Sequence, residues 1–92
     1  MIRSFKDADA AALFAGRPVA RFANIRSVAE RKLQMLHRAT VLNDLRIPPN
    51  NRLEALKRER RGQYSIRIND QWRVCFRFEG GQADDVEIGD YH

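Results

Sequence analysis

The sequence predicts a single α+β domain over residues 1–92, with an N-terminal strand and helices packed on one face of a mainly antiparallel, four- to five-stranded sheet. Two observations predict this class. Apolar residues recur at helical spacing in the first half of the chain and alternate with polar residues in the second half. Helices that precede strands joined by short turns are typical of α+β domains. A chain of 92 residues has room for one such domain.

The first half of the chain contains two expected helices. Residues 2–5 should form a short strand, and Asp7 is a suitable N-cap for a helix through about Phe14. Ser27 with Glu30 resembles a capping box for the second helix, and Asn24 is an alternative cap. The apolar stripe of that helix comprises Ile25, Val28, Ala29, Leu33, Leu36, and Ala39 or Thr40.

The second half of the chain has the period of β-strands. Residues 41–47 allow one more helical turn, and the Pro-Pro-Asn-Asn run at 48–51 predicts a loop. Strands are expected at residues 53–57, 64–69 and 72–79, and a last strand includes Val86 and Ile88. Asn69-Asp70-Gln71 and Gly80-Gly81 are the predicted hairpin turns.

Alternation along the two central strands sorts their side chains onto two faces. The apolar set should face the helices: Tyr64, Ile66, Ile68, Trp72, Val74, Phe76 and Phe78. The opposite face should carry Ser65, Arg67, Arg73, Cys75 and Arg77. An uncovered face lined by arginines would bind phosphate, because a guanidinium donates two parallel hydrogen bonds to phosphate oxygens. The alternative is an ordinary polar outer face.

The positive charge is concentrated in one part of the chain. The formal net charge is +5, and residues 52–77 alone hold eight Lys and Arg against three Asp and Glu, which accounts for the whole excess. A concentrated positive field favours a polyanionic partner, most simply nucleic acid. A solvated basic surface is the alternative.

Several other classes of protein are not indicated. Cys75 is the only cysteine, so an internal disulfide is excluded and a reducing cytoplasmic location is expected. No apolar run approaches the ~20 residues of a membrane span. No phosphate-binding glycine loop and no zinc-type Cys/His spacing is found, so neither a cofactor nor a metal is expected.

With these elements placed, the chain resembles the HigB toxins of bacterial type II toxin–antitoxin systems, in the RelE/ParE superfamily. The resemblance is carried by I-R-S-F-K, V-A-E-R-K-L, R-L-E-A-L-K, S-I-R-I-N-D-Q-W-R-V-C-F and the terminal D-Y-H. It covers nearly the whole chain. It implies a RelE/ParE-like fold for residues 1–92, cleavage of messenger RNA on the ribosome, and inhibition by a helix-turn-helix antitoxin.

The resemblance also implies functional residues. The family's terminal Asp-Tyr-His corresponds to Asp90, Tyr91 and His92, and its arginine after the strand tryptophan corresponds to Arg73. Its basic residue at the end of the strand that follows the long loop corresponds to Lys57. A histidine that family members carry in that strand is replaced here by Glu54. The remaining cations of the basic stretch are expected to bind RNA phosphates: Arg58, Arg60, Arg61, Arg67 and Arg77.

RNA cleavage without a metal needs a base, an acid and cations. The ribose 2′-OH attacks the adjacent phosphate and the 5′-oxygen leaves. His92 is the natural proton carrier, because imidazole titrates near neutral pH. Asp90 could orient it, and Tyr91 could stack on a base or bond the 2′-OH. Glu54 is the alternative base, but neighbouring cations favour its ionised form, so an orienting or ion-pairing role is preferred.

The expected partners follow from the resemblance. They are messenger RNA in the ribosomal A site, an antitoxin of HigA type and, for the antitoxin-bound complex, operator DNA; no membrane partner is expected. Two rival functions remain open at this point. One is a non-enzymatic gyrase inhibitor of ParE type with the same fold, and the other is a plain RNA-binding module.

Overall fold

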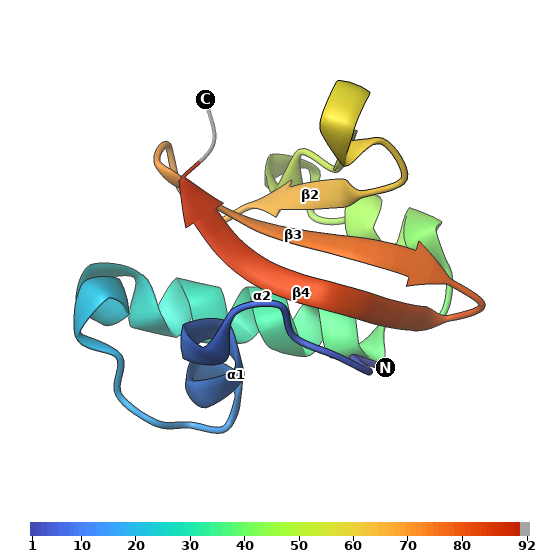
Figure 1. The fold of residues 1–92 in the computed structure, drawn as a ribbon. Coiled ribbons are helices and arrows are strands. Elements are labelled where there is room, and N and C mark those ends of the chain that lie inside the picture. Colours follow the sequence, from blue (N-terminus) through green and yellow to red (C-terminus); the bar gives the residue numbers. More distant parts are fainter. Residues whose placement is uncertain (91–92) are drawn as a thin grey trace.

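The computed structural model describes residues 1–90 and confirms the α+β class (Figure 1). Helices α1 (Ala8–Phe14) and α2 (Arg26–Arg38) lie on one side of a four-stranded sheet. Each strand pairs antiparallel with the next along the chain. The strands are β1 (Glu54–Ala55), β2 (Tyr64–Arg67), β3 (Trp72–Glu79) and β4 (Gln82–Asp90). No helix within residues 1–90 is long and apolar enough to cross a membrane.

The N-terminal segment lies beside β4 but does not form a regular strand. Ile2 and Phe5 make isolated parallel bridges to Ala83 and Val86. β4 contains one extra residue relative to β3, because Cys75 pairs with Glu87 whereas Arg77 pairs with Asp84. This bulge keeps both Ala83 and Val86 buried although three positions separate them. The predicted first strand is therefore present only as two bridges that follow the bulged edge.

The two helices begin in different ways. The Asp7 side chain accepts a hydrogen bond from the Asp9 amide at 2.9 Å, which confirms the predicted cap of α1. The capping box predicted from Ser27 and Glu30, and the alternative cap Asn24, are both wrong. The chain enters α2 directly from a 3₁₀-helix, η1 (Ala20–Ile25), and the N-cap residue Ile25 makes no side-chain hydrogen bond. Because the preceding backbone is already helical, no extended residue is available there to form a box.

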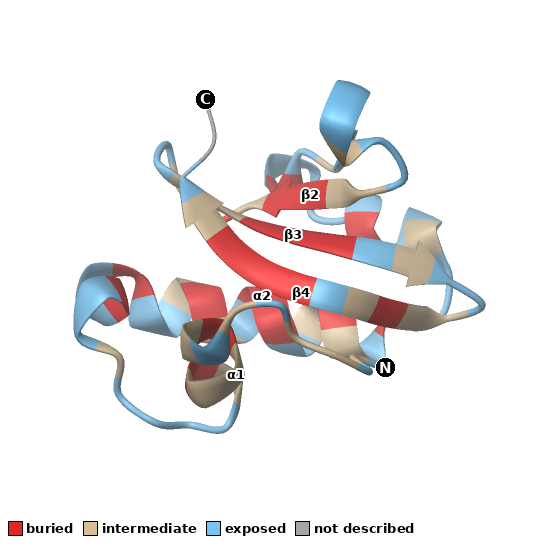
Figure 2. Cartoon of the chain, viewed as in Figure 1, coloured by how far each residue is buried: buried red, intermediate tan, exposed pale blue. Residues whose placement is uncertain are grey.

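The hydrophobic core lies between the helices and the sheet, as Figure 2 shows by the buried positions on both layers. The predicted inward face is confirmed. Ile66, Ile68, Val74 and Phe76 belong to the buried core, and Tyr64, Trp72 and Phe78 pack against it. The Trp72 ring meets Phe22 edge to face at 5.4 Å, and thus joins β3 to η1.

The connection from α2 to the sheet consists of short turns. The extra helical turn predicted within residues 41–47 is confirmed as the 3₁₀-helix η2 (Leu42–Arg46), and the predicted loop contains η3 (Pro49–Asn51). The strand predicted over 53–57 is shorter, because Lys57 already begins the η4 turn (Arg58–Arg60). This connection places η3, β1 and η4, with their basic residues, along the β1 edge of the sheet.

Candidate nucleic-acid interface

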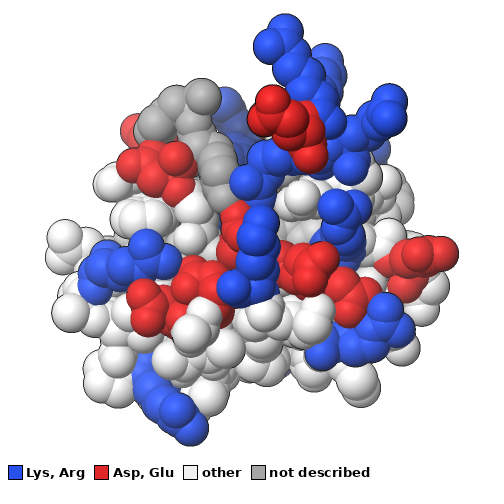
Figure 3. Space-filling view, viewed as in Figure 1, with Lys and Arg blue, Asp and Glu red and all other residues white. Residues whose placement is uncertain are grey.

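The cations of residues 52–77 divide into two groups, which differ in whether a carboxylate neutralises them. In Figure 3, Lys and Arg gather over the segment that carries η4, whereas Asp and Glu follow the line of β4. Four arginines reach acidic partners, and we call them the paired arginines. Their ion pairs are Arg67 with Asp70, Arg73 with Glu54 at 3.8 Å, Arg77 with Asp85 at 3.5 Å, and Arg60 with Glu87 at 2.8 Å.

The other four residues, which we call the loop cations, are Arg52, Lys57, Arg58 and Arg61. All four are exposed. Within residues 1–90, no carboxylate lies within 4.0 Å of any of their charged nitrogens. They are carried by the turns on either side of β1, so their charges meet solvent along one edge of the sheet. An unneutralised group of this kind attracts phosphate-bearing ligands.

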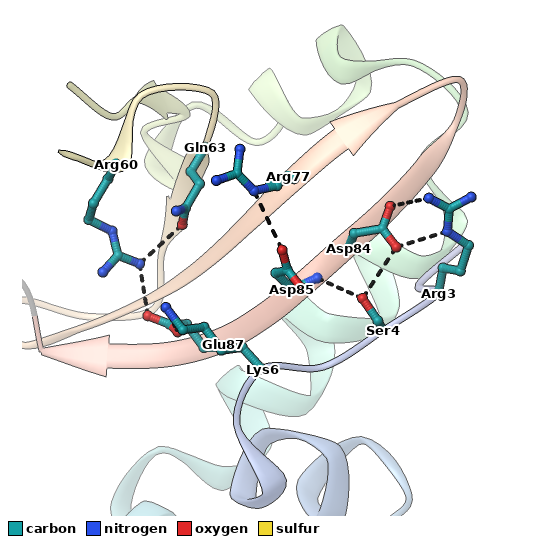
Figure 4. A network of polar contacts seen from close by, with 9 residues as sticks. All are labelled: Arg3, Ser4, Lys6, Arg60, Gln63, Arg77, Asp84, Asp85 and Glu87. Carbon is teal, nitrogen blue, oxygen red and sulfur yellow. Dashed lines mark hydrogen bonds and ion pairs between the residues drawn. The ribbon is translucent and has the colours of Figure 1, made fainter. Parts of the chain in front are cut away.

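The expectation of an uncovered, arginine-lined sheet face is wrong. Ser65 is 0% and Cys75 1% exposed, although both lie on the face away from the helices. Figure 4 shows the Arg60 guanidinium, which comes from the η4 turn and reaches Glu87 on β4. It donates to Gln63 Oε1 at 3.1 Å and to Glu87 Oε1 at 2.8 Å. Arg60 lies close to Cys75, and Arg73 Nε donates to Ser65 Oγ, so arginine side chains that were predicted to bind RNA cover part of this face.

Burial under this cover also determines the state of Cys75. Loss of hydration is the main cause that raises the pKa of its thiol to about 11, and Glu87 adds to the increase, while Arg60 and Arg73 oppose it. A thiol with that pKa stays protonated at neutral pH and is a weak nucleophile. Cys75 is therefore a small buried residue of β3 and not a reactive thiol.

Arg73 is held rigidly beside β1. Its side chain is 15% exposed. Its Nε donates to Ser65 Oγ and its Nη2 to the Arg52 carbonyl, both at 2.8 Å. None of the hydrogen bonds within residues 1–90 uses its Nη1. The guanidinium is thus oriented beside the backbone of Arg52, one of the loop cations, and its Nη1 has no protein acceptor in the described chain.

Glu54 adjoins Arg73 from the edge strand. It pairs with Ser65 across the β1–β2 ladder, and its exposed carboxylate lies 3.8 Å from the Arg73 guanidinium. The structure therefore brings together Glu54 and Arg73, with Lys57 just beyond the end of β1. This contact agrees with the ion-pairing role preferred for Glu54, and a role as a base stays a prediction.

Asp90 lies on a different side of the sheet from Arg73. In the β3–β4 ladder, Trp72 pairs with Asp90 and Arg73 with Gly89. Because successive strand residues point to opposite faces, Asp90 is on the Trp72 side. Its Oδ2 accepts a hydrogen bond from Gln71 Nε2 at 3.2 Å. The two other predicted catalytic residues of this terminus, Tyr91 and His92, lie outside the described residues.

The backbone on either side of β1 has an unusual conformation that was not expected from the sequence. Arg52 has φ = 46° and Arg58 φ = 58°, so two non-glycine residues in the left-handed region bracket β1. Such strain concentrates at functional sites. No glycine or asparagine occupies either position, so the sequence contained no signal for these turns. Within the described part of the chain, no group of three or more His, Cys, Asp or Glu could hold a metal ion.

Comparisons with known proteins point to one family. Residues 4–92 match the family described as the RelE-like toxin of the type II toxin–antitoxin system HigB. The fold is similar to the crystal structure of YafQ from E. coli strain BL21(DE3), with a TM-score of 0.70 at 11% sequence identity, over 98% of this chain and 91% of that chain.

Two curated proteins show closer similarity in sequence. Toxin HigB-1 of Vibrio cholerae is 43% identical over 60 residues, which are 65% of this chain and 63% of that protein. Endoribonuclease HigB of Proteus vulgaris is 34% identical over 61 residues, which are 66% of this chain and 65% of that protein. The matched segments thus span slightly less than two thirds of these relatives.

Proposed function

We propose that this chain, which belongs to the RelE-like HigB toxins of type II toxin–antitoxin systems, is an endoribonuclease that cleaves messenger RNA on the ribosome. The observation that carries the proposal is the Arg73 guanidinium, which two hydrogen bonds orient beside the backbone of Arg52, one of the unneutralised loop cations. A similar protein bears the name endoribonuclease, which supports the reaction class. Membership of the family also supports an antitoxin as a partner.

The cations would bind and polarise the scissile phosphate. Arg73 would donate to a nonbridging oxygen as negative charge grows during 2′-OH attack, and Lys57 would act from the end of β1. The loop cations Arg52, Arg58 and Arg61 would hold the flanking phosphates. Because Arg60, Arg67 and Arg77 are paired with acids, we assign them to the architecture of the site and not to RNA binding.

Proton transfer would be carried out by the terminal residues. His92 would be the general base or acid, Tyr91 would contact the base or the 2′-OH, and Asp90 would act from its position beside Gln71. Glu54 would hold Arg73 by their ion pair, and it becomes the leading alternative base if His92 has no role. No step in this scheme requires a metal or a cofactor.

Dependence on the ribosome is the second part of the proposal. The loop cations form a small surface, which can hold a few phosphates but cannot bend free RNA for in-line attack. A ribosome that presents the message would supply that geometry, and positioning of this kind can contribute a large rate factor. A HigA-type antitoxin would silence the toxin, and the complex of the two would bind operator DNA.

The experiment compares purified parent protein with a chain that lacks His92. Both are mixed with a translating complex and with the same message free in solution, and transcript ends are mapped. We expect the parent to cut only in the complex, and the deletion to lower cleavage by ~10²-fold or more with an unchanged melting temperature. Equal cutting of free and translated message contradicts ribosome dependence. Stalled gyrase without RNA cleavage would instead support the gyrase inhibitor.

A further inference from the structure

Asn51 is a buried polar residue that the proposed reaction leaves without a role. It is 0% exposed, and its amide joins the α2 helix to the η2–η3 connection. Nδ2 donates to the Leu45 carbonyl at 3.1 Å and lies 3.0 Å from Met35 Sδ, while Oδ1 accepts from Lys32 Nζ. A buried amide with this many contacts fixes the segment that carries it, because breaking them leaves polar groups unsatisfied.

Lys32 supplies the charged partner of this amide. The residue is 7% exposed, and burial lowers the pKa of its ammonium, with Arg31 and Arg67 lowering it further. Within residues 1–90, no carboxylate lies within 4.0 Å of its Nζ, and Asn51 is the acceptor to which it donates. A buried ammonium that meets a neutral acceptor holds that acceptor firmly in place.

Arg52, the residue after Asn51, connects the buried Asn51–Lys32 contact to Arg73. Arg52 adopts the left-handed conformation, φ = 46°, which a non-glycine residue keeps only when its surroundings enforce it. Its amide donates to the Pro49 carbonyl at 3.1 Å. Its own carbonyl accepts from Arg73 Nη2 at 2.8 Å. A shift of the segment that ends at Asn51 would therefore move the carbonyl that orients the guanidinium.

We propose that Asn51, supported by Lys32, is a positioning residue for Arg73. The buried amide keeps residues 45–51 against α2, which enforces the left-handed turn at Arg52. The Arg52 carbonyl and Ser65 Oγ together then set the direction in which Arg73 presents its remaining N–H groups. What Arg73 does to phosphate rests on the proposed function, whereas the positioning itself does not.

The first test is a double-mutant cycle on cleavage of translated message. Asn51→Ala is expected to lower cleavage by roughly 10-fold, and to cause no further loss when Arg73 is already alanine. Val86→Ala is the control, since it also destabilises the buried core but lies on β4 beside the N-terminal segment. The loss of cleavage caused by Val86→Ala should add to the loss caused by Arg73→Ala. Additive losses for Asn51→Ala would overturn the proposal.

The second test observes Arg73 without any activity. In protein labelled with ¹⁵N at arginine side chains, the Arg73 Nε–H signal is identified by its absence in Arg73→Lys. We expect Asn51→Asp and Lys32→Met, each of which removes one set of the Asn51 hydrogen bonds, to shift this signal and speed its exchange with water. Val86→Ala should leave it unchanged. An Arg73 signal that neither variant alters contradicts the positioning role, and a chain that cuts no RNA but shows the shift contradicts only the proposed function.

Discussion

The paired arginines and the loop cations come from the same basic stretch, yet they differ in whether the fold brings a carboxylate close to them. Arg60, Arg67, Arg73 and Arg77 each lie within 4.0 Å of a carboxylate. The loop cations have no carboxylate partner within residues 1–90, so their positive charge stays available to a polyanionic ligand. Arg67, Arg73 and Arg77 lie on β2 and β3 and Arg60 reaches back from the η4 turn to Glu87 on β4, whereas the loop cations lie in the turns on either side of β1.

Arg73 differs from the other paired arginines, because its guanidinium also donates to the backbone of a loop cation, Arg52. Its ion pair with Glu54 is long, at 3.8 Å, while its hydrogen bonds to Ser65 and Arg52 are short. It is therefore oriented mainly by neutral acceptors, which leave its positive charge available. We expect it to act in catalysis, whereas the other paired arginines act in folding.

The largest expected effect is that of Arg73→Ala on cleavage. Loss of the guanidinium should lower cleavage of translated message by ~10²–10³-fold, the scale for one donor to a developing oxyanion. Arg73→Lys should recover only part of this, because a point charge replaces a two-pronged donor. The control is Arg77→Ala, whose partner Asp85 is half exposed and whose cleavage should stay near that of the parent. Equal losses of cleavage in Arg73→Ala and Arg77→Ala would show that Arg73 has no special role among the paired arginines.

The next largest effect is on stability and concerns the ion pair between Arg60 and Glu87, on the sheet face away from the helices. Glu87→Gln removes the charge that pairs with Arg60 and Lys6 beside the buried Cys75, so it should lower the free energy of unfolding by about 1–3 kcal/mol. Arg60→Ala should have a similar effect. Urea denaturation measures both. If Arg60→Ala leaves stability unchanged and weakens RNA binding as strongly as Arg61→Ala, Arg60 belongs with the loop cations after all.

The outcome for Arg60 also shows what could be predicted from the sequence. Period-two alternation identified β2 and β3 and their inward residues, because burial of one sheet face imposes that pattern directly. It could not reveal that a turn returns Arg60 to the opposite face, since contacts between distant segments leave no local period. The failed capping box at Ser27 has the same cause: a 3₁₀-helix precedes α2, and no local motif announced it.

The candidate site was predictable only where the resemblance named residues. Arg73, Lys57 and Glu54 do gather at the β1 edge of the sheet. Asn51, by contrast, stood in a Pro-Pro-Asn-Asn run that any loop could contain. Its burial depends on Lys32 and Met35 from a helix distant in sequence, so no local pattern could have indicated it.

The loop cations should affect binding more than stability. Replacing Lys57 and Arg61 by alanine together should weaken binding of a single-stranded RNA by roughly 10-fold at moderate salt. It should also reduce the slope of log affinity against log salt by about 1.4, near 0.7 for each phosphate contact. Arg67→Ala is the control, because its charge is already paired with Asp70. A salt slope that stays at the parent value would show that these cations do not contact phosphate.

The smallest effect expected on stability is that of Arg58→Gly. Whether the free energy of unfolding rises or falls tests the division between the paired arginines and the loop cations. Arg58 has φ = 58°, which costs a non-glycine residue about 1 kcal/mol, and its charged nitrogens have no carboxylate partner within residues 1–90. Glycine removes the strain and the charge together. The folded protein should therefore become slightly more stable, by up to ~0.5–1 kcal/mol, while RNA binding weakens.

Arg58→Ala is the matched control, since it removes the same charge and keeps the strain. It should weaken binding equally without any gain in stability. Thermal melting and RNA titration of the two variants separate the contributions. If Arg58→Gly is destabilised to the extent expected for Arg60→Ala, the left-handed turn depends on contacts of the Arg58 side chain, and the loop cations then serve the fold as the paired arginines do.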